Sequence, residues 1–125
     1  MEKDKKQVNL PQIGRDIISF KNSPNQLDAV QLRLAGWYAF YSEEMISLEL
    51  AEATFWEENK DFGSVKPKSD PLVRALWKIT PNGKRMLEVE RTLSTIHILI
   101  SSIKASLNRQ TNEKRHEAKP TQQGW

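Results

Sequence analysis

Two apolar ladders at helical spacing constrain the fold of this chain more than any other feature of its sequence. The first repeats every seven residues and consists of Leu27, Leu34, Tyr41, Leu48 and Phe55. The second alternates steps of three and four residues and consists of Met86, Val89, Leu93, Ile96, Ile100, Ile103 and Leu107. A helix with one apolar stripe needs a partner that covers the stripe. The ladders therefore predict an all-α fold built on a long helical hairpin.

Prolines indicate where the helices begin. Pro24, Pro71 and Pro81 follow Ser, Asp and Thr, which are residue types that favour the cap of a helix. The expected helices are a long one over 24–59, a short one over 71–79 and a long one over 81–110. A strand is the alternative for the short segment, because its Val, Trp and Ile residues fit either structure.

Two details of the long helices need an interpretation. The stretch 92–103 is rich in β-branched residues, which favour strands, but the unbroken second ladder decides for helix. Gly36 lies inside the first long helix, where it costs about 1 kcal/mol relative to Ala. We interpret it as a point where another backbone or a large ring approaches closely.

The chain is long enough for one domain with a modest core. We expect a hairpin domain over 24–110, an N-terminal arm over 1–23 and a polar, mobile tail over 111–125. Within the arm, Ile13, Ile17 and Phe20 have the spacing of a short docking helix. Leu87, Ile98 and Leu99 lie off the second ladder, so one partner helix cannot cover every apolar position. Either a third helix of the same chain or another subunit covers them, and the small number of elements favours another subunit. We therefore expect an oligomeric helical bundle, held together through Leu93, Ile96, Leu99, Ile100, Ile103 and Leu107.

Charge is distributed unevenly, although the net charge is only +3. Residues 27–60 carry two basic and seven acidic groups, whereas residues 61–91 carry seven basic and four acidic groups. One interpretation is charge complementarity between helices. The other is a basic surface that binds an anionic partner.

The sequence offers little for catalysis. It has no cysteine, no phosphate-binding glycine loop and no metal-ligand spacing, and its two histidines, His97 and His116, are far apart. We expect no enzyme activity, no catalytic residue, no metal and no cofactor. No stretch approaches the roughly 20 apolar residues of a membrane span. A cytoplasmic protein, in the host cytoplasm if viral, is the expectation, with no membrane partner.

A basic segment between the ladders suggests nucleic-acid binding. Seven cations surround one tryptophan, and cations bind phosphates while an exposed ring stacks on a base. The candidate residues are Lys66, Lys68, Arg74, Trp77, Lys78, Lys84, Arg85 and Arg91. The alternative is that Trp77 packs in the core and the cations only keep a structural or adaptor protein soluble, with helix-to-helix contacts as its function.

The order of residue classes between 34 and 109 is similar to that of a known family. An aromatic, glutamate-rich helix leads through a lysine-rich connection to a terminal helix. The matching residues are Trp37, Tyr38, Tyr41, Glu44, Leu48, Lys66, Lys68, Leu87, Glu90, Leu93, Ile96, Ile100, Ile103, Leu107, Asn108 and Arg109. On these residues the chain resembles the UvsY family of phage recombination mediators. That resemblance implies a small, oligomeric protein that binds single-stranded DNA and helps load a recombinase past single-strand-binding protein.

A second, local likeness covers residues 77–87 (WKITPNGKRML). This segment resembles the wing-to-helix junction of MarR- or PadR-type winged-helix regulators, in which a strand leads into the helix. It implies a strand before Thr80 and a DNA-binding regulator. The same Thr-Pro-x-Gly sequence also fits a simple helix cap.

Overall fold

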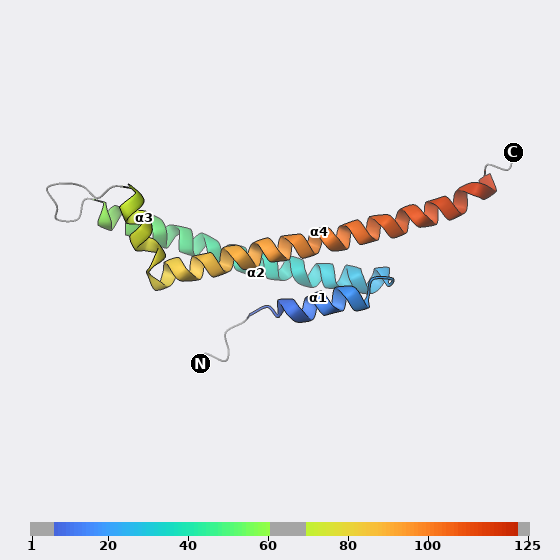
Figure 1. Cartoon of the computed structure of the whole chain (residues 1–125), viewed down its shortest axis with the longest axis horizontal. Coiled ribbons are helices and arrows are strands. Elements are labelled where there is room, and N and C mark those ends of the chain that lie inside the picture. The colour runs from blue at the N-terminus through green and yellow to red at the C-terminus, as the bar shows by residue number, and fades with distance from the viewer. Residues whose placement is uncertain (1–6, 61–69, 123–125) are drawn as a thin grey trace. The chain divides into compact units, whose positions relative to one another are not determined.

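The computed structural model describes residues 7–60 and 70–122, and side chains as far as residue 113. The described residues form helices and contain no strand, so the predicted all-α class is confirmed (Figure 1). The helices are α1 (Leu10–Ser19), α2 (Pro24–Asn59), α3 (Asp70–Lys78) and α4 (Pro81–Gln122).

The helix starts follow the prolines closely. α2 spans the predicted range, and residues 70–78 are helical rather than extended. Burial explains the helix at α3, because Val73 and Trp77 are one turn apart and both lie inside. The N-terminus of α1 is capped by Asn9, whose Oδ1 accepts a hydrogen bond from the backbone N–H of Gln12 at 3.1 Å.

The C-terminal end of α4 differs from the prediction. We expected this helix to stop near residue 110 and a mobile tail to follow, but the backbone is helical to Gln122. Residues 111–119 contain neither glycine nor proline. Extending an existing helix requires no new nucleus, so charged residues without an apolar period continue it easily. Apolar periodicity marks the part of a helix that packs against a neighbour, so it does not mark where the backbone helix ends.

The chain divides into two compact units, each of which takes a part of both long helices. The terminal unit comprises Met1–Trp37 and Ile96–Trp125, and the central unit comprises Tyr38–Thr95. Within each unit a stretch of α2 pairs with a stretch of α4, which is the pairing of a helical hairpin. The hairpin domain expected over 24–110 is thus divided between the two units.

The core of the terminal unit includes one residue of the short helix expected in the N-terminal arm. Ile13 on α1 is 2% exposed, whereas Ile17 and Phe20 are only half-buried. Arg33 on α2 forms an ion pair with Asp16 on α1 at 3.5 Å. The side-chain amide of Gln110 on α4 donates a hydrogen bond to the carbonyl of Lys21 at 2.8 Å. The other buried apolar residues of this unit are Leu27, Val30, Leu34, Ile96 and Ile103.

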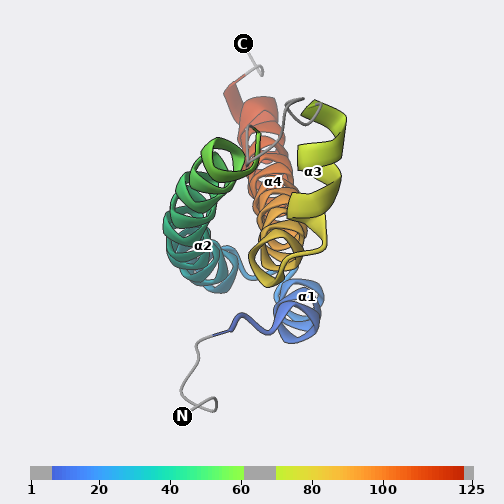
Figure 2. The ribbon, with the colours of Figure 1, turned by 90° about the vertical axis from the view of Figure 1, so that its left-hand side faces the viewer.

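The central unit has its own core, built from three helices. Figure 2 shows α3 beside the first turns of α4. The rings of Phe55 on α2 and Trp77 on α3 are 5.5 Å apart between centroids. The buried apolar residues of this unit are Tyr41, Leu48, Val73, Trp77, Met86 and Val89. Buried members of both ladders thus line the two cores, as the spacing predicted.

The residues predicted to hold subunits together lie inside or at the edge of these cores. Ile96 and Ile103 are fully buried within the terminal unit, so their assignment to a surface between subunits is wrong. Leu93, Leu99, Ile100 and Leu107 are half-buried. Of the off-ladder residues, Leu87 is 48% and Ile98 is 64% exposed. The second ladder is consequently used within the chain.

The glycines of the two long helices, Gly36 and Gly83, have opposite surroundings. Gly36 is exposed, and a Cβ built on it meets no atom within 4 Å, so the close approach predicted there is wrong. Gly83 is buried against the end of α3. A Cβ on Gly83 would collide with the carbonyl oxygen of Trp77 and would lie 3.0 Å from the Cα of Lys78. The close approach thus occurs at Gly83, where α3 turns into α4.

Candidate nucleic-acid interface

Six of the eight predicted nucleic-acid-binding residues lie in the described part of the central unit. Lys66 and Lys68 fall outside the described residues. α3 supplies Arg74, Trp77 and Lys78, and α4 supplies Lys84, Arg85 and Arg91. The structure separates these six into an interior group of two and an exposed group of four.

Trp77 belongs to the interior. Its side chain is 5% exposed, and its ring packs against Phe55. A ring in this position is unable to stack on a base, so the stacking role predicted for Trp77 is wrong and the alternative, core packing, holds. The indole Nε1 is buried without a hydrogen-bond partner among the described residues. Such an unpaired donor is costly, which indicates that apolar packing fixes this ring.

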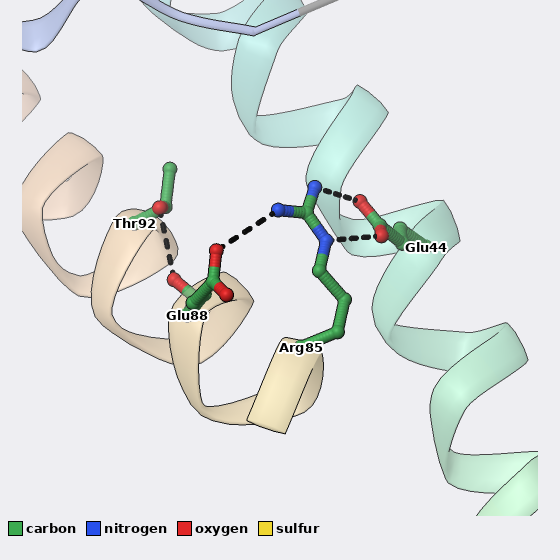
Figure 3. Close-up of polar contacts among 4 residues, drawn as sticks. All are labelled: Glu44, Arg85, Glu88 and Thr92. Atoms are coloured by element: carbon green, nitrogen blue, oxygen red, sulfur yellow. Dashed lines mark hydrogen bonds and ion pairs between the residues drawn. The ribbon is translucent and has the colours of Figure 1, made fainter. Parts of the chain in front are cut away.

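Arg85 is held by carboxylates rather than presented to solvent (Figure 3). Its Nε donates to Oε2 of Glu44 at 2.6 Å, and its Nη2 donates to Oε1 of the same residue at 2.8 Å. A third contact joins Nη1 to Oε2 of Glu88 at 3.4 Å. The guanidinium carbon also lies 5.9 Å from the centre of the Tyr41 ring. Arg85 is therefore a link between α2 and α4, and its predicted role as a phosphate contact is wrong.

The surroundings of Arg85 stabilise its charged form. The hydrogen bonds that Arg85 donates to Glu44 raise the pKa of Arg85 above its ordinary value, burial lowers it, and the charges of Glu44 and Glu88 raise it further. The favourable contributions outweigh the burial. A planar guanidinium with two parallel bonds to one carboxylate is also hard to replace by lysine.

The exposed group keeps its charges available. Arg74, Lys78, Lys84 and Arg91 are all exposed. Within the described ranges, none of these four side chains forms an ion pair. Exposed cations without protein partners are the groups that phosphates attract.

These four cations, which we call the basic strip, follow one another along the surface of the central unit. Arg74 and Lys78 are neighbours one turn apart on α3. Lys78 and Lys84 line the same hollow, which has a volume of about 390 Å³. Lys84 and Arg91 lie two turns apart on the same side of α4. The four cations thus form one row, whose widest step is the two turns between Lys84 and Arg91.

The same hollow also contains acidic groups, which the sequence did not reveal. Glu49 and Glu52 from α2 and Glu90 from α4 line it together with Lys78 and Lys84. Three carboxylates beside two ammonium groups lower the local positive potential. The hollow is therefore no phosphate pocket, and phosphates would meet the cations of the strip at its exposed surface. Glu49 and Glu52 lie far from Lys78 in sequence, so no local sequence pattern predicts that they share a hollow with it.

The junction of α3 and α4 positions Lys78 and Lys84. Thr80 caps α4 by accepting a hydrogen bond at Oγ1 from the N–H of Gly83 at 3.0 Å, and it donates from Oγ1 to the carbonyl of Trp77 at 2.6 Å. The segment before Thr80 is helical, so the strand implied by the winged-helix likeness is absent. The Thr-Pro-x-Gly sequence acts here as a cap.

Other kinds of site find no support in the described part of the chain. No group of three or more His, Asp or Glu side chains there is placed to hold a metal ion. Along the described ranges, no helix has an apolar stretch of the length that a membrane span needs. His97 is exposed on α4.

Comparison with known proteins adds no relative: no protein-family model, no curated protein and no solved structure matches this chain.

Proposed function

We propose that this protein is a non-enzymatic accessory protein that binds single-stranded nucleic acid through the basic strip. The observation that carries the proposal is that Arg74, Lys78, Lys84 and Arg91 are exposed, lie in one row and have no ion-pair partners among the described residues. Arg85, by contrast, is engaged by Glu44. Binding then depends on charge, because Trp77 is unable to offer a stacking surface.

The finer form of this proposal is recombination mediation, with a recombinase and a single-strand-binding protein as partners and self-association of the chain. It rests on the resemblance to the UvsY family. Its test is recombinase assembly on single-stranded DNA coated with single-strand-binding protein, with and without this protein. Faster assembly supports mediation. Unchanged assembly with intact DNA binding contradicts mediation and leaves only the binding of single-stranded nucleic acid.

Binding of single-stranded nucleic acid is tested by measuring the affinity of the full chain for oligo-dT over a salt series. Electrostatic binding predicts that the logarithm of affinity falls linearly with the logarithm of salt concentration. No binding at low salt contradicts the proposal.

A second candidate function, a helical adaptor, is favoured by a different observation. Ile46 and Leu50 on α2 are 58% and 66% exposed, although both are large and apolar. An adaptor retains its partner when the basic strip is neutralised, whereas a nucleic-acid-binding protein loses its ligand.

A further inference from the structure

Within the central unit, α2 carries a second apolar surface on the side opposite its buried one. Tyr41 and Leu48 face the core and are 2% and 6% exposed. Ile46 and Leu50 are 58% and 66% exposed. Since each residue turns a helix by about 100°, Leu50 points roughly 180° away from Tyr41. A helix that is covered on its Tyr41 side therefore leaves Leu50 in solvent.

The exposed residues on this side have the spacing of a helix-packing seam. The seam, which we call the outer stripe, consists of Ala39, Glu43, Ile46, Leu50, Ala53 and Glu57, and each of them is exposed. The steps alternate between four and three residues, as in the contact line between two packed helices. The small side chains of Ala39 and Ala53 allow close approach of another backbone. This geometry selects a helix as the occupant.

Charge selects the kind of helix. The stripe includes two carboxylates, Glu43 and Glu57, and the segment 38–59 contains six glutamates and no lysine or arginine. Lys60, directly after this segment, forms an ion pair with Glu57 at 3.3 Å, whereas Glu43 has no ion pair among the described residues. A second copy of this surface would bring more carboxylates than cations against the stripe, because Lys60 is the single cation in the described segment 38–60. A helix with lysine or arginine beside its apolar residues instead brings cations to Glu43 and to the Glu57 side of the stripe as it covers Ile46 and Leu50.

We propose that the outer stripe binds an amphipathic helix of a partner protein whose apolar seam is flanked by lysine or arginine. The stripe shares no residue with the basic strip. Binding of the partner helix and binding of nucleic acid can therefore be tested separately, and a negative result for one does not contradict the other.

The experiment measures binding of two synthetic peptides to the full chain by fluorescence anisotropy. Both peptides have about four heptads with leucine and isoleucine on the seam. One carries lysine at the flanking positions, and its counterpart carries glutamate there. The expected result is saturable binding of the lysine peptide and at least tenfold weaker binding of the glutamate peptide. Equal binding of both peptides, or binding of neither, overturns the proposal.

Substitutions then locate the surface. Ile46→Gln combined with Leu50→Gln is expected to weaken binding of the lysine peptide at least tenfold. The matched control, Ile18→Gln with Ile98→Gln, alters residues that are 71% and 64% exposed in the terminal unit, and it should leave binding unchanged. Equal losses in both variants contradict the location. Analytical ultracentrifugation tests whether a second copy of this chain occupies the stripe instead. If the wild type is an oligomer and the Ile46→Gln, Leu50→Gln variant is a monomer, a second copy covers the stripe and the proposal is overturned.

Discussion

Arg85 on α4 and Glu44 on α2 form a two-point ion pair, with N–O distances of 2.6 and 2.8 Å between their planar end groups (Figure 3). The side chains are 23% and 30% exposed, so the pair lies at the edge of the core of the central unit. It connects the two long helices of that unit. Because of this pair, Arg85 is not available at the nucleic-acid-binding surface that the sequence predicted.

Replacing Arg85 with Met should lower the free energy of unfolding by about 2 kcal/mol, because Glu44 loses a charged, two-point partner while the apolar stem is kept. Chemical denaturation followed by circular dichroism measures the loss. Arg91→Met is the control, since Arg91 is exposed and has no ion pair among the described residues. It should change stability by less than about 0.5 kcal/mol.

The pH dependence of this pair follows from the direction of the shift. The folded-state pKa of Arg85 is raised, so its contribution to stability is complete below the unfolded pKa and disappears as the pH rises through the folded pKa. Both values lie above the range in which proteins are handled. Between neutral and moderately alkaline pH, the stability difference between wild type and Arg85→Met should therefore stay constant.

The glycines of the two long helices, Gly36 and Gly83, give a second, paired prediction. Gly83→Ala should destabilise the protein by about 3 kcal/mol or more, because the new methyl group collides with the backbone at Trp77. Gly36→Ala should stabilise it by up to about 1 kcal/mol, because alanine is the better helix former and the site is open. Melting temperatures of the two variants should shift in opposite directions. Similar shifts for both would contradict the packing of α3 against α4.

The acidic residues beside the basic strip should weaken nucleic-acid binding. Glu49→Gln with Glu90→Gln removes two carboxylates that line the hollow next to Lys78 and Lys84. Affinity for oligo-dT at low salt should rise roughly fivefold, which is about 1 kcal/mol of removed repulsion. Glu43→Gln with Glu57→Gln changes the net charge equally but lies on the outer stripe, and it should have a smaller effect. The same gain in both variants would show that only net charge matters.

Local signals in the sequence predicted most of the fold. Pro24 and Pro81 mark the first residues of α2 and α4, and buried members of both ladders line the cores. Heptad spacing reports which residues face another helix, without telling whether that helix belongs to the same chain. For this reason Ile103 was assigned to a subunit interface although its own unit buries it.

The candidate site was less predictable, because adjacent residues have different partners. Lys84 and Arg85 are neighbours in sequence, yet Lys84 is exposed while Arg85 binds Glu44, which lies 41 residues away. Only the packing of α4 on α2 separates their roles. The exposed apolar surface of α2 could have been predicted from the sequence. Ile46 and Leu50 lie off the first ladder, as Leu87 and Ile98 lie off the second.

The most direct test of the basic strip compares the salt dependence of oligo-dT binding between two variants with the same loss of charge. Lys84→Gln with Arg91→Gln removes two members of the strip, whereas Lys104→Gln with Arg109→Gln removes two exposed cations of α4 in the terminal unit. Each phosphate contact on a single strand contributes about 0.7 to the slope of log affinity against log salt. Two lost contacts should therefore reduce the slope by about 1.4 in the first variant, while the second keeps nearly the wild-type slope. An unchanged slope in the first variant, or an equal reduction in both, would contradict binding through the basic strip.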